Sequence, residues 1–189
     1  MIITPLTELE AVNEILASIG EAPVDTLEEP ENVDVMNAVR MLTLVSKSVQ
    51  ARGWAWNTIS EYVMKPDRFN HQIQFNDSLL RFIPNDFYGR KRNGVLYNLT
   101  DNTDTFTADV IGEATLLVPF DEVPEPFRHY ITVRAARMFS VRYQGDSETI
   151  QELMQEEQQA YQYMFEFDID VTKPNMANNS EVRELMRRN

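Results

Sequence analysis

Apolar residues recur every three or four positions in four stretches of the chain, and glycine and proline separate these stretches. The first stretch begins at Thr7, which with Glu10 has the form of a capping box. It ends near Gly20, which can adopt the left-handed conformation that terminates a helix, and Pro23 prevents the helix from resuming. The sequence therefore predicts one short helix and three longer ones, the latter in windows free of glycine and proline: 31–52, 127–144 and 146–173.

The spacing of apolar residues indicates which face each helix buries. In the window 31–52, Met36, Met41 and Leu44 lie off the main stripe, so this helix is predicted to pack on two sides. The window 127–144 is rich in arginine and the window 146–173 in glutamate, which favours antiparallel pairing of these two helices. The stripes consist of Leu9, Val12, Leu16 and Ile19; Val35, Val39, Leu42, Val45 and Val49; Phe127, Ile131, Ala135 and Met138; and Ile150, Leu153, Ala160 and Met164.

Residues 54–120 have a different pattern, with short runs of alternating and β-favouring residues. Asn93 and Gly94 between two such runs are a strong signal for a hairpin turn. The runs predicted to form strands are 59–64, 71–75, 79–83, 95–99, 105–111 and 115–119.

Together these patterns predict an α+β fold. We expect a four-helix bundle made of residues 1–53 and 121–173, with a β-rich insertion, residues 54–120, between the second and third helices. Residues 174–189 are poor in core-forming side chains and are expected to form an extended C-terminal tail.

Composition narrows the classes of function. The chain has 189 residues, no cysteine and a formal net charge of −13. Disulfides and thiolate metal sites are therefore excluded, and no apolar run approaches the ~18 residues of a membrane span. Binding to duplex DNA requires clustered lysine and arginine, so the acidic balance argues against it. It does not argue against DNA passing through a ring built from such subunits, since an acidic wall would repel DNA.

The residues that could carry catalysis or bind a cofactor form no recognisable constellation. His71 and His129 lie in different predicted modules and do not make a zinc site, and no glycine-rich phosphate loop is present. No cofactor is therefore expected. Paired carboxylates could hydrolyse glycosides, but in a chain with 30 acids neighbouring pairs also arise as a solvated surface. The acids considered for such a pair are Asp104, Asp109, Glu113, Asp121, Glu122 and Glu125.

Three groups of residues are candidates for contacts with other proteins. A basic run beside the predicted hairpin is either a solvated turn or a docking point for an acidic partner: Arg90, Lys91 and Arg92. The tail poses the same question and suits capture in a partner's groove: Arg183, Leu185, Met186, Arg187 and Arg188. Aromatic residues on more than one face of the fourth helix indicate a subunit interface: Tyr161, Tyr163, Phe165 and Phe167. Trp54 and Trp56 are instead expected to pack where the helices meet the strands.

Four segments in the same order resemble the tail tubular protein A family, the head-to-tail adaptor of short-tailed phages (podoviruses). The first is the most specific, and the resemblance does not extend closely to residues 64–115 or to the tail. The segments are 10–27, EAVNEILASIGEAPVDTL; 50–57, QARGWAWN; 121–131, DEVPEPFRHYI; and 153–157, LMQEE, followed by Ala160.

This resemblance implies a structural virion protein and no enzyme. It implies an adaptor ring of twelve copies that joins the portal protein to the tail nozzle (tail tubular protein B) and forms part of the channel for DNA ejection. Contact with tail fibres is left open, and no membrane is involved. The protein is expected in the virion tail, and in the host cytoplasm during assembly. Two other classes remain, a tail-associated polysaccharide hydrolase that uses paired carboxylates and an acidic protein-binding module.

Overall fold

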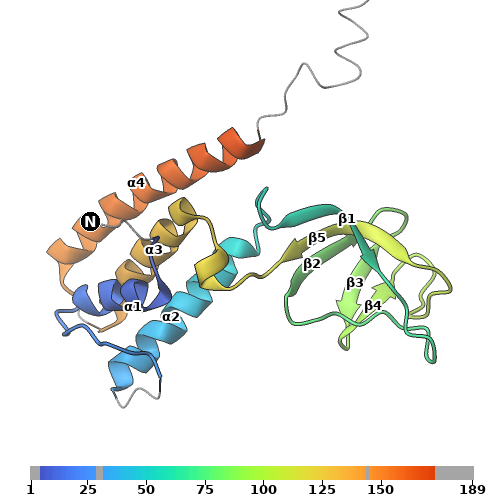
Figure 1. The fold of residues 1–189 in the computed structure, drawn as a ribbon, viewed down its shortest axis with the longest axis horizontal. Helices are drawn as coiled ribbons and strands as arrows, with labels where there is room; N and C mark the ends of the chain where they lie inside the picture. Colours follow the sequence, from blue (N-terminus) through green and yellow to red (C-terminus); the bar gives the residue numbers. More distant parts are fainter. Residues whose placement is uncertain (1–4, 29–31, 144, 173–189) are drawn as a thin grey trace, which may run out of the picture.

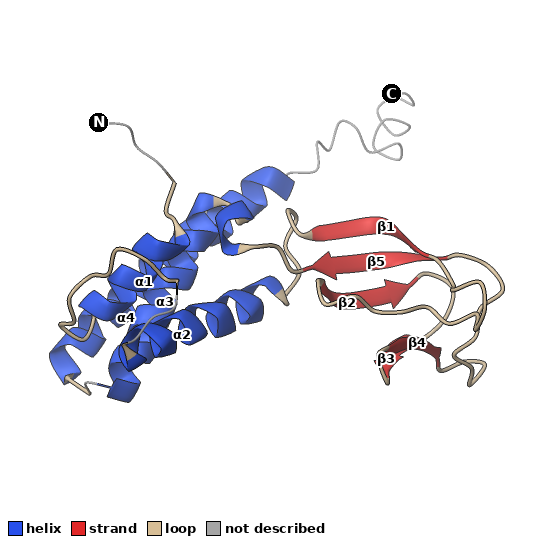
Figure 2. Cartoon of the chain, turned by 60° about the horizontal axis from the view of Figure 1, so that its bottom comes forward, coloured by secondary structure: helices blue, strands red, loops and turns tan. Residues whose placement is uncertain are grey.

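The computed structural model describes residues 5–28, 32–143 and 145–172. Within these residues helices lie at one end of the molecule and strands at the other (Figures 1 and 2), which makes the fold α+β, as predicted. The finer prediction of a four-helix bundle with an insertion, and the boundaries given to these parts, stay predictions. The elements are α1 (Glu8–Ala17), α2 (Val33–Gln50), β1 (Thr58–Met64), β2 (Leu79–Pro84), β3 (Gly89–Arg92), β4 (Val95–Asn98), β5 (Val110–Leu116), η1 (Phe120–Glu122), α3 (Glu125–Tyr143) and α4 (Ser147–Thr172).

Helix α1 begins and ends where its sequence signals predict. The Thr7 side chain accepts a hydrogen bond from the Glu10 backbone at 3.2 Å, and the Glu10 carboxylate accepts one from the Thr7 backbone at 2.8 Å, which completes the capping box. Gly20 lies just beyond the helix with φ +80°, a conformation that costs glycine little. The buried face carries Val12 and Leu16 of the predicted stripe.

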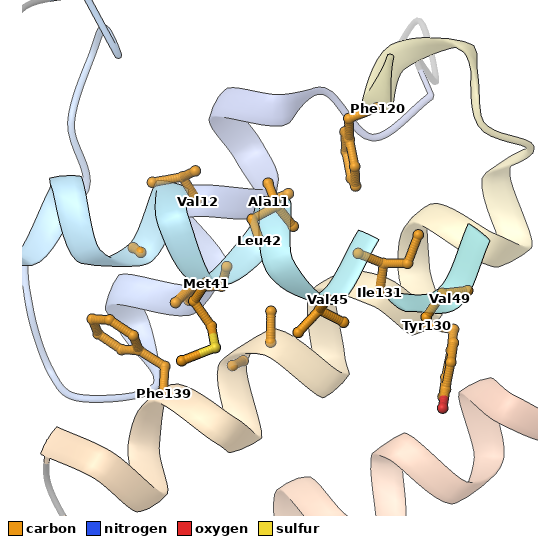
Figure 3. Packing of buried hydrophobic residues seen from close by; sticks show 14 of the residues in the cluster. Ala11, Val12, Met41, Leu42, Val45, Val49, Phe120, Tyr130, Ile131 and Phe139 are labelled. Carbon is orange, nitrogen blue, oxygen red and sulfur yellow. The ribbon is translucent and has the colours of Figure 1, made fainter. Parts of the chain in front are cut away.

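Helix α3 is the centre of the helical core. It packs against α1, α2 and α4, and buried side chains lie around most of its circumference. Between α2 and α3, Met41 and Phe139 point toward one another, and Val45 lies beside them (Figure 3). Helix α2 packs against both α1 and α3, but two of its off-stripe residues, Met36 and Leu44, are 47% and 53% exposed within the described chain. Only Met41 among the three off-stripe residues is buried.

Helix α4 runs antiparallel to α3, as the charge pattern predicted. Glu157 on α4 pairs with Arg134 on α3 at 3.4 Å and also pairs with Arg137. Early residues of α3 meet late residues of α4, since the rings of Phe127 and Phe167 lie 6.3 Å apart.

The strands form two antiparallel sheets. The larger has the order β1-β5-β2, and β3 and β4 form a hairpin. Asn93 and Gly94 have φ +51° and +83°, so the predicted hairpin turn is confirmed. The predicted strand at 71–75 is wrong: it forms only isolated bridges, at Gln72 and Gln74. The runs 105–111 and 115–119 are replaced by the single strand β5, which has Gly112 at its centre.

Strand β5 continues through Gly112, although the sequence pattern predicted two separate strands on either side of this residue. Gly112 pairs with Tyr62 on one side and Pro84 on the other. A Cβ atom at this residue would lie 2.2 Å from the Ile83 carbonyl oxygen, so only glycine allows this approach of the strands. Beneath the sheet lies a second buried cluster: Met64, Ile73, Leu79, Phe82, Leu96, Phe106, Val110 and Ala114.

Two buried amides join the helical end to the sheet. Gln50, at the end of α2, accepts a hydrogen bond from the Val118 backbone at 2.9 Å and donates one to the Val118 carbonyl at 3.0 Å. Asn57 accepts from the Trp54 backbone at 2.8 Å and donates to the Gln50 and Leu116 carbonyls. The chain entering β1 and the chain leaving β5 are therefore both tied to the end of α2.

The two tryptophans pack at this same junction, as predicted. The ring of Trp54 lies 5.0 Å from that of Phe127, and the ring of Trp56 lies 5.2 Å from it. Both contacts are edge-on, the arrangement that aromatic rings favour.

Candidate interaction surfaces

The acids considered for glycoside hydrolysis serve mainly as structural contacts. Two of them tie the N-terminal segment to α3 and η1, because Glu125 accepts from the Leu6 backbone at 3.0 Å and Asp121 accepts from the Glu8 backbone at 3.2 Å. The others lie in the strand region or on η1: Asp104 accepts from Gln72 at 2.8 Å, Asp109 pairs with Lys65 at 3.9 Å, Glu113 pairs with Arg81 at 3.0 Å, and Glu122 is exposed.

Among the described residues, three carboxyl groups have an altered pKa, but in each the pKa is lowered, whereas a general acid needs a raised one. Hydrogen bonds from the Thr7 backbone and side chain lower the pKa of Glu10, and backbone hydrogen bonds from Phe69 and Asn70 lower that of Asp67. The Thr149 side chain and backbone lower the pKa of Asp146. A catalytic acid requires a raised pKa, so these three groups are turn and helix caps rather than proton donors.

The histidines lie apart from any cluster of metal ligands. His71 occupies a turn with φ +58°, and His129 is exposed on α3. In the described ranges no group of three or more His, Cys, Asp or Glu residues could hold a metal ion.

The predicted basic run forms strand β3 and is exposed along its length. Lys91 lies over the ring of Phe75 at 5.5 Å, and Arg92 lies over the ring of Tyr97 at 4.8 Å. Arg90 faces Tyr97 in the hairpin register. Aromatic rings thus hold two of these cations in place, and both earlier interpretations, a solvated turn or a docking point, remain. The tail candidates lie outside the described residues: Arg183, Leu185, Met186, Arg187 and Arg188.

The aromatic run of α4 divides into two inward and two outward residues. The Tyr161 ring lies 5.5 Å from that of Tyr130, and Phe167 contacts Phe127, so both contribute to the chain's own core. Tyr163 and Phe165 are 61% and 45% exposed. A lone chain therefore leaves half of the predicted interface residues in solvent.

The sequence analysis missed a groove between α2 and the end of α3. Its volume is about 560 Å³, and it combines apolar and basic side chains. The position of the apolar Leu44 off the α2 stripe was the available signal. We call this surface the α2–α3 groove; it is lined by Asn37, Arg40, Met41, Thr43, Leu44, Lys47, Arg142 and Tyr143.

The outer face of the three-stranded sheet is a second exposed apolar surface that the sequence analysis missed. Val63 on β1 pairs directly with Ile111 on β5, and Ile83 on β2 lies beside them. Their exposed fractions are 45%, 44% and 48%. The strand alternation was visible in the sequence, but it did not reveal that the outward face also carries apolar residues.

These surfaces, rather than a pocket with reactive groups, are the outstanding features of the described chain. Residues 9–174 match the family model described as tail tubular protein. The chain belongs to the tail tubular protein family. A tail tubular protein is a structural component of the phage tail, so this protein is a part of the virion tail.

No curated protein matches this tail tubular protein. None of its described helices is both long enough and apolar enough to cross a membrane.

Proposed function

We propose that this tail tubular protein is the adaptor subunit that joins the portal protein to the tail nozzle. Several copies would form a ring whose centre is part of the DNA ejection channel. The observation that carries the proposal is helix α4. It is 26 residues long, yet only Ala160 and Met164 on it are buried. Five of its large apolar side chains are 44–61% exposed: Met154, Tyr163, Phe165, Ile169 and Val171.

Exposure of this extent along one helix is unusual for a monomer and typical of a surface that another protein covers. The family assignment supports a covering partner that is another virion protein or a copy of the chain itself. The helices would form the wall of the ring as one four-helix bundle. The sheet would then project from the wall as an insertion and offer the apolar row of Val63, Ile111 and Ile83 to the nozzle protein.

The acidic composition supports a channel through which DNA passes rather than a surface that binds DNA. With a net charge of −13 per chain, ring subunits would repel phosphates wherever acids line the channel. Screening over about 8 Å keeps this effect local. The channel wall would therefore let DNA slide without binding it in a sequence-specific way.

Sedimentation velocity of the purified protein, alone and mixed with portal protein, tests the proposal. The adaptor function predicts that the chain joins portal in a single large species. A chain that remains monomeric and indifferent to portal would instead be an acidic binding module. A chain with glycosidase turnover that depends on two of its carboxylates would be a hydrolase.

We also propose that the segment after Thr172 contacts portal, because it combines basic and apolar residues suited to a groove. A chain that lacks residues 174–189 should unfold at the same temperature as the full chain but fail to join portal. Normal joining by the truncated chain would reject this assignment and leave the ring proposal standing.

A further inference from the structure

The α2–α3 groove carries positive charge that no ion pair among the described residues neutralises. Arg40, Lys47 and Arg142 are exposed, and none of them has an ion-pair partner among the described residues. Between these cations lie apolar side chains, since Leu44 is 53% and Tyr143 49% exposed.

The outer face of α4 has the complementary character. Helical spacing brings to one side of α4 a set of exposed residues that we call the α4 ridge: Glu148, Glu152, Glu156, Tyr163 and Glu166. Its acids form no ion pair in the part of the chain that the structure describes. Tyr163 is the large apolar group on this acidic surface and is 61% exposed.

We propose that the α2–α3 groove receives the α4 ridge of a neighbouring copy of this chain. The lengths match, because Arg40 and Lys47 are about 10 Å apart along α2 and Glu148 and Glu156 about 12 Å apart along α4. The contact pairs the groove cations with the ridge carboxylates. Charge complementarity of this kind fixes the partner and its register.

The positions of the two surfaces determine the kind of assembly. Helix α3 lies between α2 and α4 (Figures 1 and 3), so the groove on α2 and the ridge on α4 are separate surfaces of the chain. A contact between two different surfaces is head-to-tail, and repetition of it closes into a ring when the rotation permits. A two-fold dimer would instead require one surface to meet itself. This inference rests on the proposed function, because a ring needs such a contact.

Charge reversal tests the contact in the full chain bound to portal. The groove variant is R40E/K47E, and the ridge variant is E152K/E156K. Each alone should assemble at least about tenfold less well than the wild type, because like charges then face each other. An equimolar mixture of the two should recover assembly, since reversed grooves then meet reversed ridges and native grooves meet native ridges. All four positions are exposed, so circular dichroism and the melting temperature should stay unchanged.

The control variant is R68E, which reverses an exposed cation in the strand region and should assemble normally. Wild-type assembly together with full assembly of both reversed variants would overturn the groove–ridge contact and leave the adaptor function intact. Loss in both variants without recovery in the mixture would also overturn it. Failure of the wild type to assemble would reject the proposed function itself. If the wild type binds a DNA oligonucleotide and only the groove variant loses this binding, the groove is a nucleic-acid site and the proposal is contradicted.

Discussion

Gln50 offers the most quantitative test of how the helical end is fixed to the sheet. Its side chain is fully buried, with 0% exposure, and its amide satisfies both the backbone N–H and the carbonyl of Val118. It also donates to the Ser46 hydroxyl at 3.1 Å. The substitution Gln50→Met keeps the length and approximate volume of the side chain but removes all three hydrogen bonds.

The expected cost follows from the two backbone groups that lose their partners. A buried polar group left unsatisfied costs about 1–3 kcal/mol. Because the bonds to Val118 are only partly buried, each should fall in the lower half of that range, and the free energy of unfolding should drop by about 3 kcal/mol.

Urea unfolding followed by tryptophan fluorescence is the suitable assay, since Trp54 and Trp56 lie at the junction itself. The matched control is Gln151→Met, the same substitution at an exposed position of α4, which should change stability by less than about 0.5 kcal/mol. A loss below about 1 kcal/mol for Gln50→Met, equal to that of the control, would refute the view that this amide holds the junction.

Four further perturbations follow from individual contacts. Replacing Thr7 by alanine removes the α1 capping box and should lower the free energy of unfolding in urea by about 1 kcal/mol. Hydrogen bonds from Thr7 depress the pKa of Glu10 below 4.5. The charged Glu10 carboxylate therefore stabilises the fold above pH 4.5, and this contribution is lost as the pH falls through the lowered pKa. The melting temperatures of the wild type and Glu10→Gln should converge in acid. Gly112→Ala would force a Cβ to within 2.2 Å of the Ile83 carbonyl, so we expect a loss of more than about 3 kcal/mol, and a wild-type melting curve would contradict this strand register. Glu157→Gln weakens the pairing with two arginines of α3 and should cost about 1.5 kcal/mol by the same urea assay, an effect that salt should reduce if the pairing is ionic.

Local signals in the sequence predicted the elements whose causes are local. Thr7 and Glu10 are three residues apart, and Asn93 and Gly94 are adjacent, so helix capping and turn formation depend on neighbours that the sequence displays directly. The strand at 71–75 was predicted wrongly because its composition favours β structure while its pairing partners lie elsewhere in the chain. Only isolated bridges form there, so propensity alone did not decide the outcome.

The residues that fix the fold over long distances could not be identified in this way. Gln50 and Val118 are 68 positions apart, and nothing in either segment indicates that they meet. The groove poses the same difficulty, since Arg40 and Lys47 come from α2 whereas Arg142 comes from the end of α3. The interface candidates on α4 show a partial success: helical periodicity identified an excess of aromatic residues, but only the packing showed that Tyr163 and Phe165 are the exposed ones.

The central claim is that this protein functions as a structural subunit at the junction of capsid and tail. Quantitative mass spectrometry of purified infectious particles, with the portal protein as an internal standard, tests it most directly. We expect the chain at a fixed ratio to portal that corresponds to one complete ring per particle. Its absence from infectious particles, or an amount far below one ring, would contradict the account.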